Sequence, residues 1–448
     1  MHLRLTTDSI PRLMRAISIP ASIGFFFNTM FNVIDTYFAG LISTQAIAAL
    51  SLSFPVFFII LSLGSGISTG TIALIATALG SSDSARAKMF AIQGVSFGLL
   101  ISVAVTTIGI MVSPQLFILL GATGPYLDMC LAFMNTIFLG SVFFIMNFML
   151  NAVLNALGDT RTFRNFLIAG CFLNMALDPW FIYGGLGVPA MGVRGVALAT
   201  VFVQMLGNLY LGYKVSHTKL TCARCFREII PRPEAFGEIA RQGFPTSLNS
   251  VTVGVGVFVI TYFISIFGKE AVAAYGIATR IEQIILMPTI GLSIATVTLV
   301  AQNNGACLYE RIFETIHTAL KYGGFFMAFG TVLLLIFAGS LMGLFSSDEQ
   351  VIAIGTLYLR ISAFILYAYV ILYVNISALQ GVKKPAFGLS IGCIRQIALP
   401  VVVFPFLAEL LGMGLTGIWT GIFIINWGAA LFTFLYAKAH LKRVLVAG

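Results

Sequence analysis

The chain has 448 residues, of which 59% are hydrophobic and 9% charged, whereas soluble domains carry about one quarter charged residues. Apolar runs of 20 to 30 residues recur along its whole length, and each is long enough to cross a hydrocarbon core of about 30 Å as a helix. The composition excludes a soluble globular domain and predicts an integral membrane protein. The net charge is +9, and where its basic residues lie along the chain decides which partners they predict.

Twelve apolar runs predict an all-α membrane protein with twelve transmembrane helices. In chain order they cover residues 16–41, 47–78, 89–113, 129–157, 163–185, 191–215, 238–268, 271–301, 314–343, 350–380, 386–407 and 414–438. We expect each span to be helical, because a helix satisfies all of its backbone hydrogen bonds within one segment.

The basic residues predict the orientation of these spans. If the N-terminus is cytoplasmic, twenty of the 25 Lys and Arg residues fall on the inside, and only Arg194 and Lys269 fall outside. Arg280, Arg360 and Arg395 lie within spans. The positive-inside rule then places both termini in the cytoplasm, and we expect a multi-pass protein of a bacterial inner membrane. The basic balance reflects this topology and contact with anionic membrane lipids, so it predicts no nucleic-acid partner. We expect a monomer.

The longest hydrophilic stretch, HTKLTCARCFREIIPRPEAFGE (217–238), divides the chain near its middle. It predicts a first lobe at 1–216, a cytoplasmic linker at 217–237 and a second lobe at 238–448. Cys222 and Cys225 form a lone CxxC in this stretch, without the second ligand pair of a zinc site, so we expect two reduced thiols and no metal centre.

The two halves resemble each other. Residues 66–81 lie over 291–306 with six identities at an offset of 225, and 192–200 lie over 414–422 at an offset of 222. Two copies of a six-span unit have the same orientation, which predicts a parallel repeat about an axis along the membrane normal. Such pseudo-symmetric lobes are typical of transporters that work by alternating access.

A carboxylate in the first span stands out, because a charge at membrane depth costs at least about 2.5 kcal/mol. Asp35 shares one helical stripe with Asn28 and Asn32, at i−7 and i−3. A stripe of amides and a carboxylate faces protein or water rather than lipid. It is either a polar seam between packed helices or a cation or proton site.

The fifth span carries a second polar pair, Asn174 and Asp178, four residues apart on one face. From the helical rise, both aspartates lie in the outer half of the membrane, and Thr200 in the sixth span reaches a similar level. We expect these side chains to form one site. Two carboxylates in a low-dielectric pocket repel each other and titrate as a unit. The site could hold a proton, or the same oxygens could coordinate Na⁺; the residues leave both options open.

Pro20 and Gly24 lie below Asp35 in the first span and predict a bend there, because proline removes a helical hydrogen bond and glycine adds freedom. As a hinge, Pro20 would let Asp35 shift the helix between straight and bent forms. A passive proline in a transmembrane helix is the alternative.

The second half lacks an equivalent of Asp35, since the repeat offset places Ile260 there. Its one acid at membrane depth is Glu282. We predict a structural ion pair between Glu282 and either Arg280 or Arg360, because an unpaired buried charge is costly. Ion coupling is therefore predicted in the first lobe alone.

Together these features resemble the multidrug and toxic compound extrusion (MATE) family, in particular its DinF-like branch, over nearly the whole chain. The matching motifs are Pro20 followed by NVIDTYFAG (32–40), NALGDTRT (155–162), NMALDPWFIYGGLGVPAMGVRGVALAT (174–200), RIEQIILMPTIGL (280–292) and LVAQNNGA (299–306). The resemblance implies a coupling site at Asp35, Asn174, Asp178 and Thr200. The family's other branch places acids in spans seven and ten, which lack them at membrane depth here.

These features predict a secondary antiporter that exports small lipophilic cationic compounds in exchange for protons. Coupling to Na⁺ is the first alternative, and a flippase for lipids or lipid-linked precursors is another. An enzyme is not expected, because all four histidines lie in loops or at span ends. No cofactor is predicted besides the coupling ion, H⁺ or Na⁺.

Overall fold

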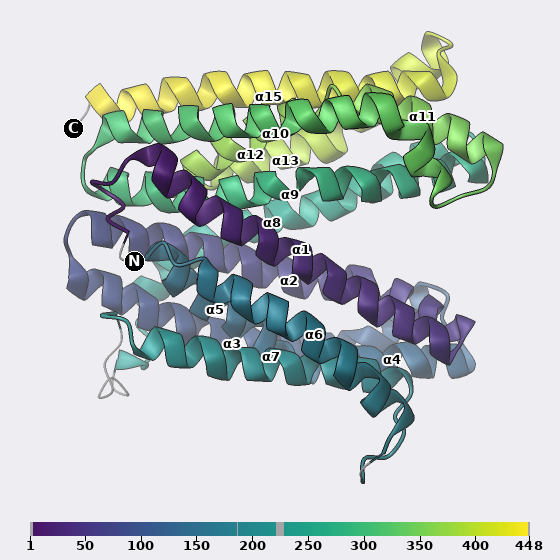
Figure 1. Ribbon diagram of the computed structural model, residues 1–448, viewed down its shortest axis with the longest axis horizontal. Helices are drawn as coiled ribbons and strands as arrows, with labels where there is room; N and C mark the ends of the chain where they lie inside the picture. The colour runs from purple at the N-terminus through teal and green to yellow at the C-terminus, as the bar shows by residue number, and fades with distance from the viewer. Residues whose placement is uncertain (1–2, 186, 221–227, 447–448) are drawn as a thin grey trace. The chain divides into compact units, whose positions relative to one another are not determined.

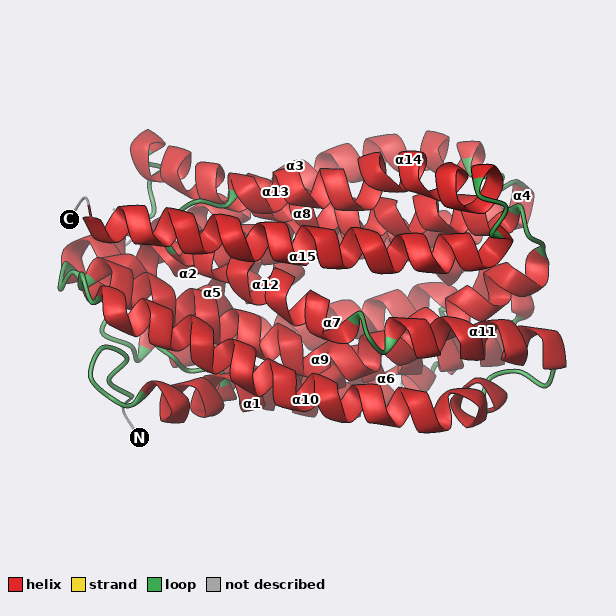
Figure 2. Ribbon diagram, turned by 90° about the horizontal axis from the view of Figure 1, so that it is seen from above, coloured by secondary structure: helices red, strands yellow, loops and turns green. Residues whose placement is uncertain are grey.

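The computed structural model describes residues 3–185, 187–220 and 228–446, and these form helices joined by loops (Figure 2). Within those ranges, an isolated bridge between Gly185 and Val188 is the only β-type pairing. Cys222 and Cys225 lie outside the described residues. The all-α prediction is confirmed.

The helices of the first half are labelled in Figure 1. They are α1 (Ile10–Ile42), α2 (Thr44–Gly80), α3 (Ser84–Leu119), α4 (Gly124–Leu139), α5 (Ser141–Ala156), α6 (Arg161–Tyr183) and α7 (Val193–Ser216). Side chains fix several starts: Ser43 accepts a hydrogen bond from the backbone N–H of Ala46 at the start of α2, and Asp83 accepts one from Arg86 at the start of α3.

The second half repeats this order. Its helices are α8 (Pro233–Ser265), α9 (Lys269–Gly305), α10 (Tyr309–Gly343), α11 (Glu349–Ser362), α12 (Leu366–Gly381), α13 (Ala386–Cys393), the π-helical η2 (Ile394–Ala398), α14 (Leu399–Pro405), the π-helical η3 (Phe406–Leu410) and α15 (Gly414–Val446). Within the described chain, ten segments are long and apolar enough to cross a membrane, or twelve if each of two bent pairs is one span.

The two bent pairs occupy equivalent places in the two halves. α4 and α5 meet at 42° across Gly140, and α11 and α12 meet at 51°. These pairs are the fourth and tenth predicted spans, so both copies of the repeat bend the same member. The ten to twelve apolar segments agree with the predicted spans, and the parallel orientation of the two copies stays a prediction.

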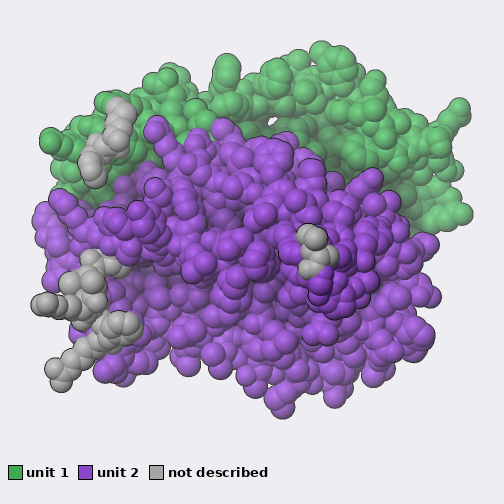
Figure 3. Space-filling view, turned by 60° about the horizontal axis from the view of Figure 1, so that its bottom comes forward, with its two compact units in different colours: residues 1–22, 248–448 green, residues 23–247 purple. Residues whose placement is uncertain are grey.

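The chain forms two compact units (Figure 3). Their boundaries lie within helices rather than at residues 217–237. One unit contains Met1–Ser22 and Leu248–Gly448, and the other contains Ile23–Ser247. This division differs from the lobes predicted at 1–216 and 238–448, because the first part of α1 groups with the second half and the first part of α8 with the first half. Both boundaries lie two residues after a proline, Pro20 or Pro245, and these prolines are separated by the repeat offset of 225.

Two glycines at equivalent positions of the two halves allow the first parts of α1 and α8 to pack closely within these units. A Cβ added to Gly66 of α2 would collide with the backbone and side chain of Ser247 in α8, within one unit. A Cβ added to Gly291 of α9 would collide with Ser22 and with the carbonyl oxygen of Ser18 in α1, within the other unit. Gly66 and Gly291 are 225 residues apart, as are Ser22 and Ser247. Each repeat therefore uses a glycine to admit the first helix of the other copy at backbone distance.

The chain that leads into α8 is fixed to α3. The Gln93 side-chain amide donates to the carbonyl oxygens of Glu228 and Ile230, at 2.7 and 2.9 Å, and its oxygen accepts from the backbone N–H of Arg232. Arg86 forms a salt bridge with Glu238 at 3.0 Å. The predicted linker is therefore packed against its own unit at its C-terminal end, and α8 begins at Pro233, inside the range predicted for the linker.

Candidate functional site

Asp35 lies in α1 with 8% of its surface exposed, inside the unit formed by Ile23–Ser247. Its Oδ1 accepts a hydrogen bond of 2.6 Å from Asn174 Nδ2 of α6, and its Oδ2 lies 3.1 Å from Thr200 Oγ1 of α7. Two helices, α6 and α7, thus supply the partners of this carboxyl of α1, and both of its oxygens have partners.

Asn174 links the two acids predicted to act together. Its Nδ2 also donates to Asp178 Oδ2 at 2.9 Å, one turn further along α6. Asn174 and Asp178 are both fully buried. The i, i+4 spacing points both side chains the same way, so a single amide group bridges the two carboxyls. The structure brings together all four residues predicted for the coupling site.

Two acceptor oxygens in this cluster lack a donor. Asp178 Oδ1 and Asn174 Oδ1 are buried and have no hydrogen-bond partner among the described residues. A buried acceptor left unpaired costs about 1–3 kcal/mol, and more if it is charged. A proton on Asp178 Oδ1 would turn that oxygen into a donor, and a small cation is the other kind of group that such oxygens bind. The arrangement therefore suits a site that exchanges a positive charge.

Thr200 can serve either protonation state of Asp35. Its Oγ1 lies 3.0 Å from the carbonyl oxygen of Val196 as well as 3.1 Å from Asp35 Oδ2. A hydroxyl has one proton to donate and two lone pairs to accept with. It can donate a hydrogen bond to an ionised Asp35. Alternatively, it can donate to the carbonyl oxygen of Val196 and accept a hydrogen bond from a protonated Asp35 Oδ2.

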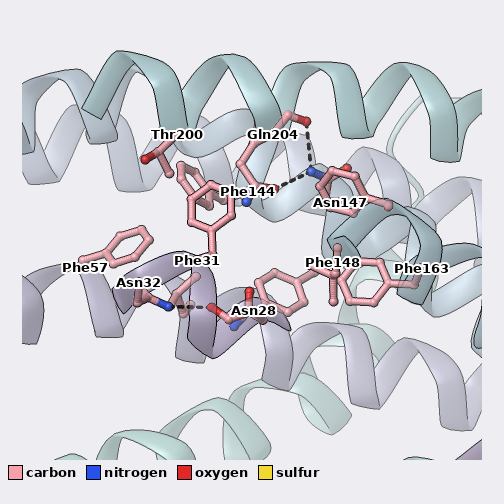
Figure 4. A pocket seen from close by; sticks show the side chains of 13 residues that line it. Asn28, Phe31, Asn32, Phe57, Phe144, Asn147, Phe148, Phe163, Thr200 and Gln204 are labelled. Carbon is pink, nitrogen blue, oxygen red and sulfur yellow. Dashed lines mark hydrogen bonds between the residues drawn. The ribbon is translucent and has the colours of Figure 1, made fainter. Parts of the chain in front are cut away.

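A small cavity adjoins this cluster (Figure 4). The cavity volume is about 40 Å³, which is enough for a few water molecules. A drug-sized pocket has a volume of roughly 300 Å³ or more. Its polar lining comes from Asn28, Asn32, Asn147, Thr200 and Gln204, and phenylalanines form most of the rest. Thr200 lines the cavity and contacts Asp35, so it connects the two. The predicted stripe of Asn28 and Asn32 thus faces this cavity.

Asn147 and Gln204 line this cavity and were not singled out from the sequence. Asn147 Nδ2 donates to Gln204 Oε1 at 2.7 Å and to its backbone oxygen at 2.9 Å. A sequence signal existed for both: Gln204 follows Thr200 by four residues, and Asn147, Asn151 and Asn155 recur at that spacing in α5.

The predicted hinge residues lie in an unbroken helix, since α1 runs from Ile10 to Ile42 through Pro20 and Gly24. Gly24 has a packing role as well. A Cβ there would approach Leu167 Cδ1 to 3.2 Å and Arg164 Cα to 3.3 Å, so glycine lets α1 lie close to α6.

The ion pair predicted for Glu282 is wrong. Glu282 is 5% exposed, and its Oε2 accepts a hydrogen bond of 3.1 Å from the hydroxyl of Tyr358. Arg280 and Arg360 are exposed, and no salt bridge of the described residues includes Glu282. The physical reason is spacing, since residues two apart on a helix point to different faces, so Arg280 turns outward where Glu282 turns inward.

Tyr358→Phe is expected to lower the free energy of unfolding by about 1–3 kcal/mol, because it leaves Glu282 buried without its hydrogen-bond donor. Thermal unfolding of the purified protein in detergent measures this as a lower Tm. Arg360→Gln is the matched control, and we expect its Tm to equal that of the wild type. An equal loss in both variants would restore the ion-pair interpretation.

Comparison with known proteins identifies the family. The family model MatE matches the chain twice, over residues 20–180 and 245–406. The two matches begin at Pro20 and Pro245, one in each half, and together cover most of the chain. The protein belongs to the MATE family. Members of this family are transporters and not enzymes, so the cluster around Asp35 lies in a transport protein.

Relatives of this MATE protein carry different functional names. It is 27% identical over 452 residues to a probable multidrug resistance protein, NorM, of Thermotoga maritima, covering 98% of this chain and 96% of that one. It is 27% identical over 398 residues to a FAD transporter of Shewanella oneidensis, covering 88% and 87%. Its fold matches a MOP superfamily transporter from Pyrococcus furiosus with a TM-score of 0.92 at 25% identity, covering 99% and 98%. The expected fold and family are confirmed.

Proposed function

We propose that this MATE protein exports lipophilic cationic compounds in exchange for protons by alternating access, in a bacterial inner membrane with both termini in the cytoplasm. The observation that carries the proposal is the buried carboxyl pair of Asp35 and Asp178, joined through Asn174. Two carboxyls that share a low-dielectric site repel each other when both are charged, so a proton bound by the pair relieves that repulsion.

The geometry supports a role for each residue in this proposed exchange. Asp35 takes up and releases the proton, and Thr200 keeps a hydrogen bond to it in both states. Asn174 holds the two carboxyls at a fixed separation. Pro20 is the proposed hinge, and its position two residues from the boundary between the compact units supports a bend there.

The substrate class rests on the aromatic side chains beside the coupling site and on the relatives' names. Aromatic walls attract cations through their π faces, and phenylalanines dominate the lining next to Thr200. The relative named as a multidrug resistance protein supports export of small organic compounds. The relative named as a FAD transporter indicates that this fold also handles molecules with phosphate groups.

Coupling to Na⁺ is the second candidate. The unpaired oxygens of Asn174 and Asp178 favour it, because amide and carboxylate oxygens are suitable ligands for a hard cation. Asp35 Oδ1 belongs to the same hydrogen-bonded cluster.

The coupling ion is tested by export in proteoliposomes. We expect an imposed pH gradient to drive export of a lipophilic cation with no Na⁺ present, and a Na⁺ gradient at equal pH to have no effect. Export that follows only the Na⁺ gradient would replace the proton by Na⁺. Export driven by neither gradient would contradict antiport by this site.

A further inference from the structure

A buried arginine lies in the middle of a membrane span of the unit formed by residues 1–22 and 248–448. Arg395 is 9% exposed and is the tenth residue of the span Ala386–Leu410. The helical rise places it about 14 Å from the start of that span, near the centre of a hydrocarbon core of about 30 Å. An arginine at this depth is costly and marks a partner or a functional site.

Among the described residues, the partners of this guanidinium are neutral. Arg395 Nη1 donates to Asn426 Oδ1 at 2.7 Å, and Cζ lies 5.8 Å from the centroid of the Tyr369 ring. Tyr373 stacks on Tyr369 at 6.4 Å. No salt bridge of the described residues includes Arg395, and Glu282, the acid at membrane depth in this unit, is bound to Tyr358.

Within the described chain, two of the three guanidinium nitrogens of Arg395 remain free to donate hydrogen bonds to a ligand. Nε and Nη2 of Arg395 form no hydrogen bond with the described residues, and neither is among the buried polar atoms sealed from solvent without a partner. These nitrogens therefore border on accessible space. A guanidinium presents its donors as a planar fork that matches carboxylate and phosphate groups.

The backbone around Arg395 is also unusual. Residues Ile394–Ala398 form a π-helical turn, closed by the N–H of Leu399 donating to the carbonyl oxygen of Ile394. Pro400 follows directly and has no N–H to offer the preceding turn, which explains why the helix widens here. Such π-turns are frequent at functional sites.

We propose that Arg395, with Asn426 and Tyr369, binds an anionic group, carboxylate or phosphate, carried by an exported compound. Resting on the proposed export function, this adds a second requirement: preferred substrates combine a lipophilic cation with an acidic group. A lipid resting in the bilayer is not the source of the anion, because its headgroup lies at the membrane surface and Arg395 lies near the centre of the span. Tyr369 and Tyr373 supply an aromatic surface beside the charge.

A matched pair of dyes tests this proposal. Tetramethylrhodamine carries a cationic ring system and a carboxylate, and its methyl ester has the same rings without the acid. Binding to the purified protein is measured by fluorescence anisotropy. For Arg395→Gln, we expect affinity for the acid to fall at least about tenfold, equivalent to about 1.4 kcal/mol, and affinity for the ester to change less than about twofold. Arg360→Gln, which removes an exposed arginine of the same unit, is expected to change neither.

Arg395→Lys keeps the charge but loses the fork, so we expect it to weaken acid binding less than Arg395→Gln and to leave ester binding unchanged. If size-exclusion chromatography shows that Arg395→Gln does not fold, Arg395→Lys replaces it as the test variant. Equal losses for acid and ester, or no loss for the acid, would overturn the anionic site while leaving the proposed export intact. Wild-type protein that binds neither dye would contradict the proposed substrate class and this site with it.

Discussion

Asp35→Asn is expected to abolish export while leaving the protein folded. Asparagine has the same shape and can keep contacts with Asn174 and Thr200, but it cannot take up or release a proton at neutral pH. Uptake of a lipophilic fluorescent cation into inside-out membrane vesicles measures the activity. We expect the variant to match vesicles that lack the transporter, with an unchanged size-exclusion profile of the purified protein.

Asp128→Asn is the matched control, because Asp128 is an exposed acid in α4 of the same unit. Its export is expected to equal that of the wild type. Normal export by Asp35→Asn would show that this carboxyl does not couple transport. Loss in both variants would indicate a general effect of removing acidic charge.

Gly66→Val and Gly291→Val are each expected to prevent accumulation of folded protein. In both cases the added side chain meets the main chain of a neighbouring helix at Ser247 or near Ser22, so relief requires moving a helix rather than turning a side chain. Overpacking of this kind costs at least about 1–3 kcal/mol, which is a large part of typical protein stability. Expression and detergent size-exclusion profiles of a fluorescent fusion measure the result.

Gly276→Val is the control for Gly291→Val, because Gly276 lies in the same helix and no atom comes within 4 Å of a Cβ added there. Gly212→Val in α7 is the control for Gly66→Val, because Gly212 lies in the same compact unit and no atom comes within 4 Å of a Cβ added there. Controls as poorly folded as the test variants would show that valine in these helices, not the close approach, causes the loss. Well-folded Gly66→Val or Gly291→Val would contradict the tight crossing itself.

The spans were predictable because burial in lipid constrains sequence strongly. A helix in hydrocarbon must satisfy its own backbone and be apolar over about 20 residues, and both features can be counted. The division of the chain into compact units was not predictable in this way. The hydrophilic stretch at 217–237 marks the repeat, whereas the exchange of helix ends depends on close contacts at Gly66 and Gly291, and hydropathy does not detect these.

The cluster around Asp35 was predictable because few polar groups occur at one depth. The helical rise placed Asp35 at the same expected membrane level as Asn174 and Asp178, which share one face of a second helix, so their proximity could be predicted. Which oxygens remain unpaired was beyond sequence reasoning, since that depends on rotamers fixed by packing. Membrane depth alone led to one wrong prediction, the ion pair of Glu282. Glu282 shares a span with Arg280 but faces a different side of the helix, where the Tyr358 hydroxyl donates a hydrogen bond to it.

The most direct test of the coupling site is proton release on substrate binding. A lipophilic cation is added to concentrated, weakly buffered wild-type protein in detergent, and the pH change is followed with an indicator dye. Binding of a cation that displaces the proton held by Asp35 and Asp178 predicts acidification in proportion to bound substrate, and none in Asp35→Asn. Substrate binding without proton release by the wild type, or equal release by Asp35→Asn, would contradict proton exchange at this site.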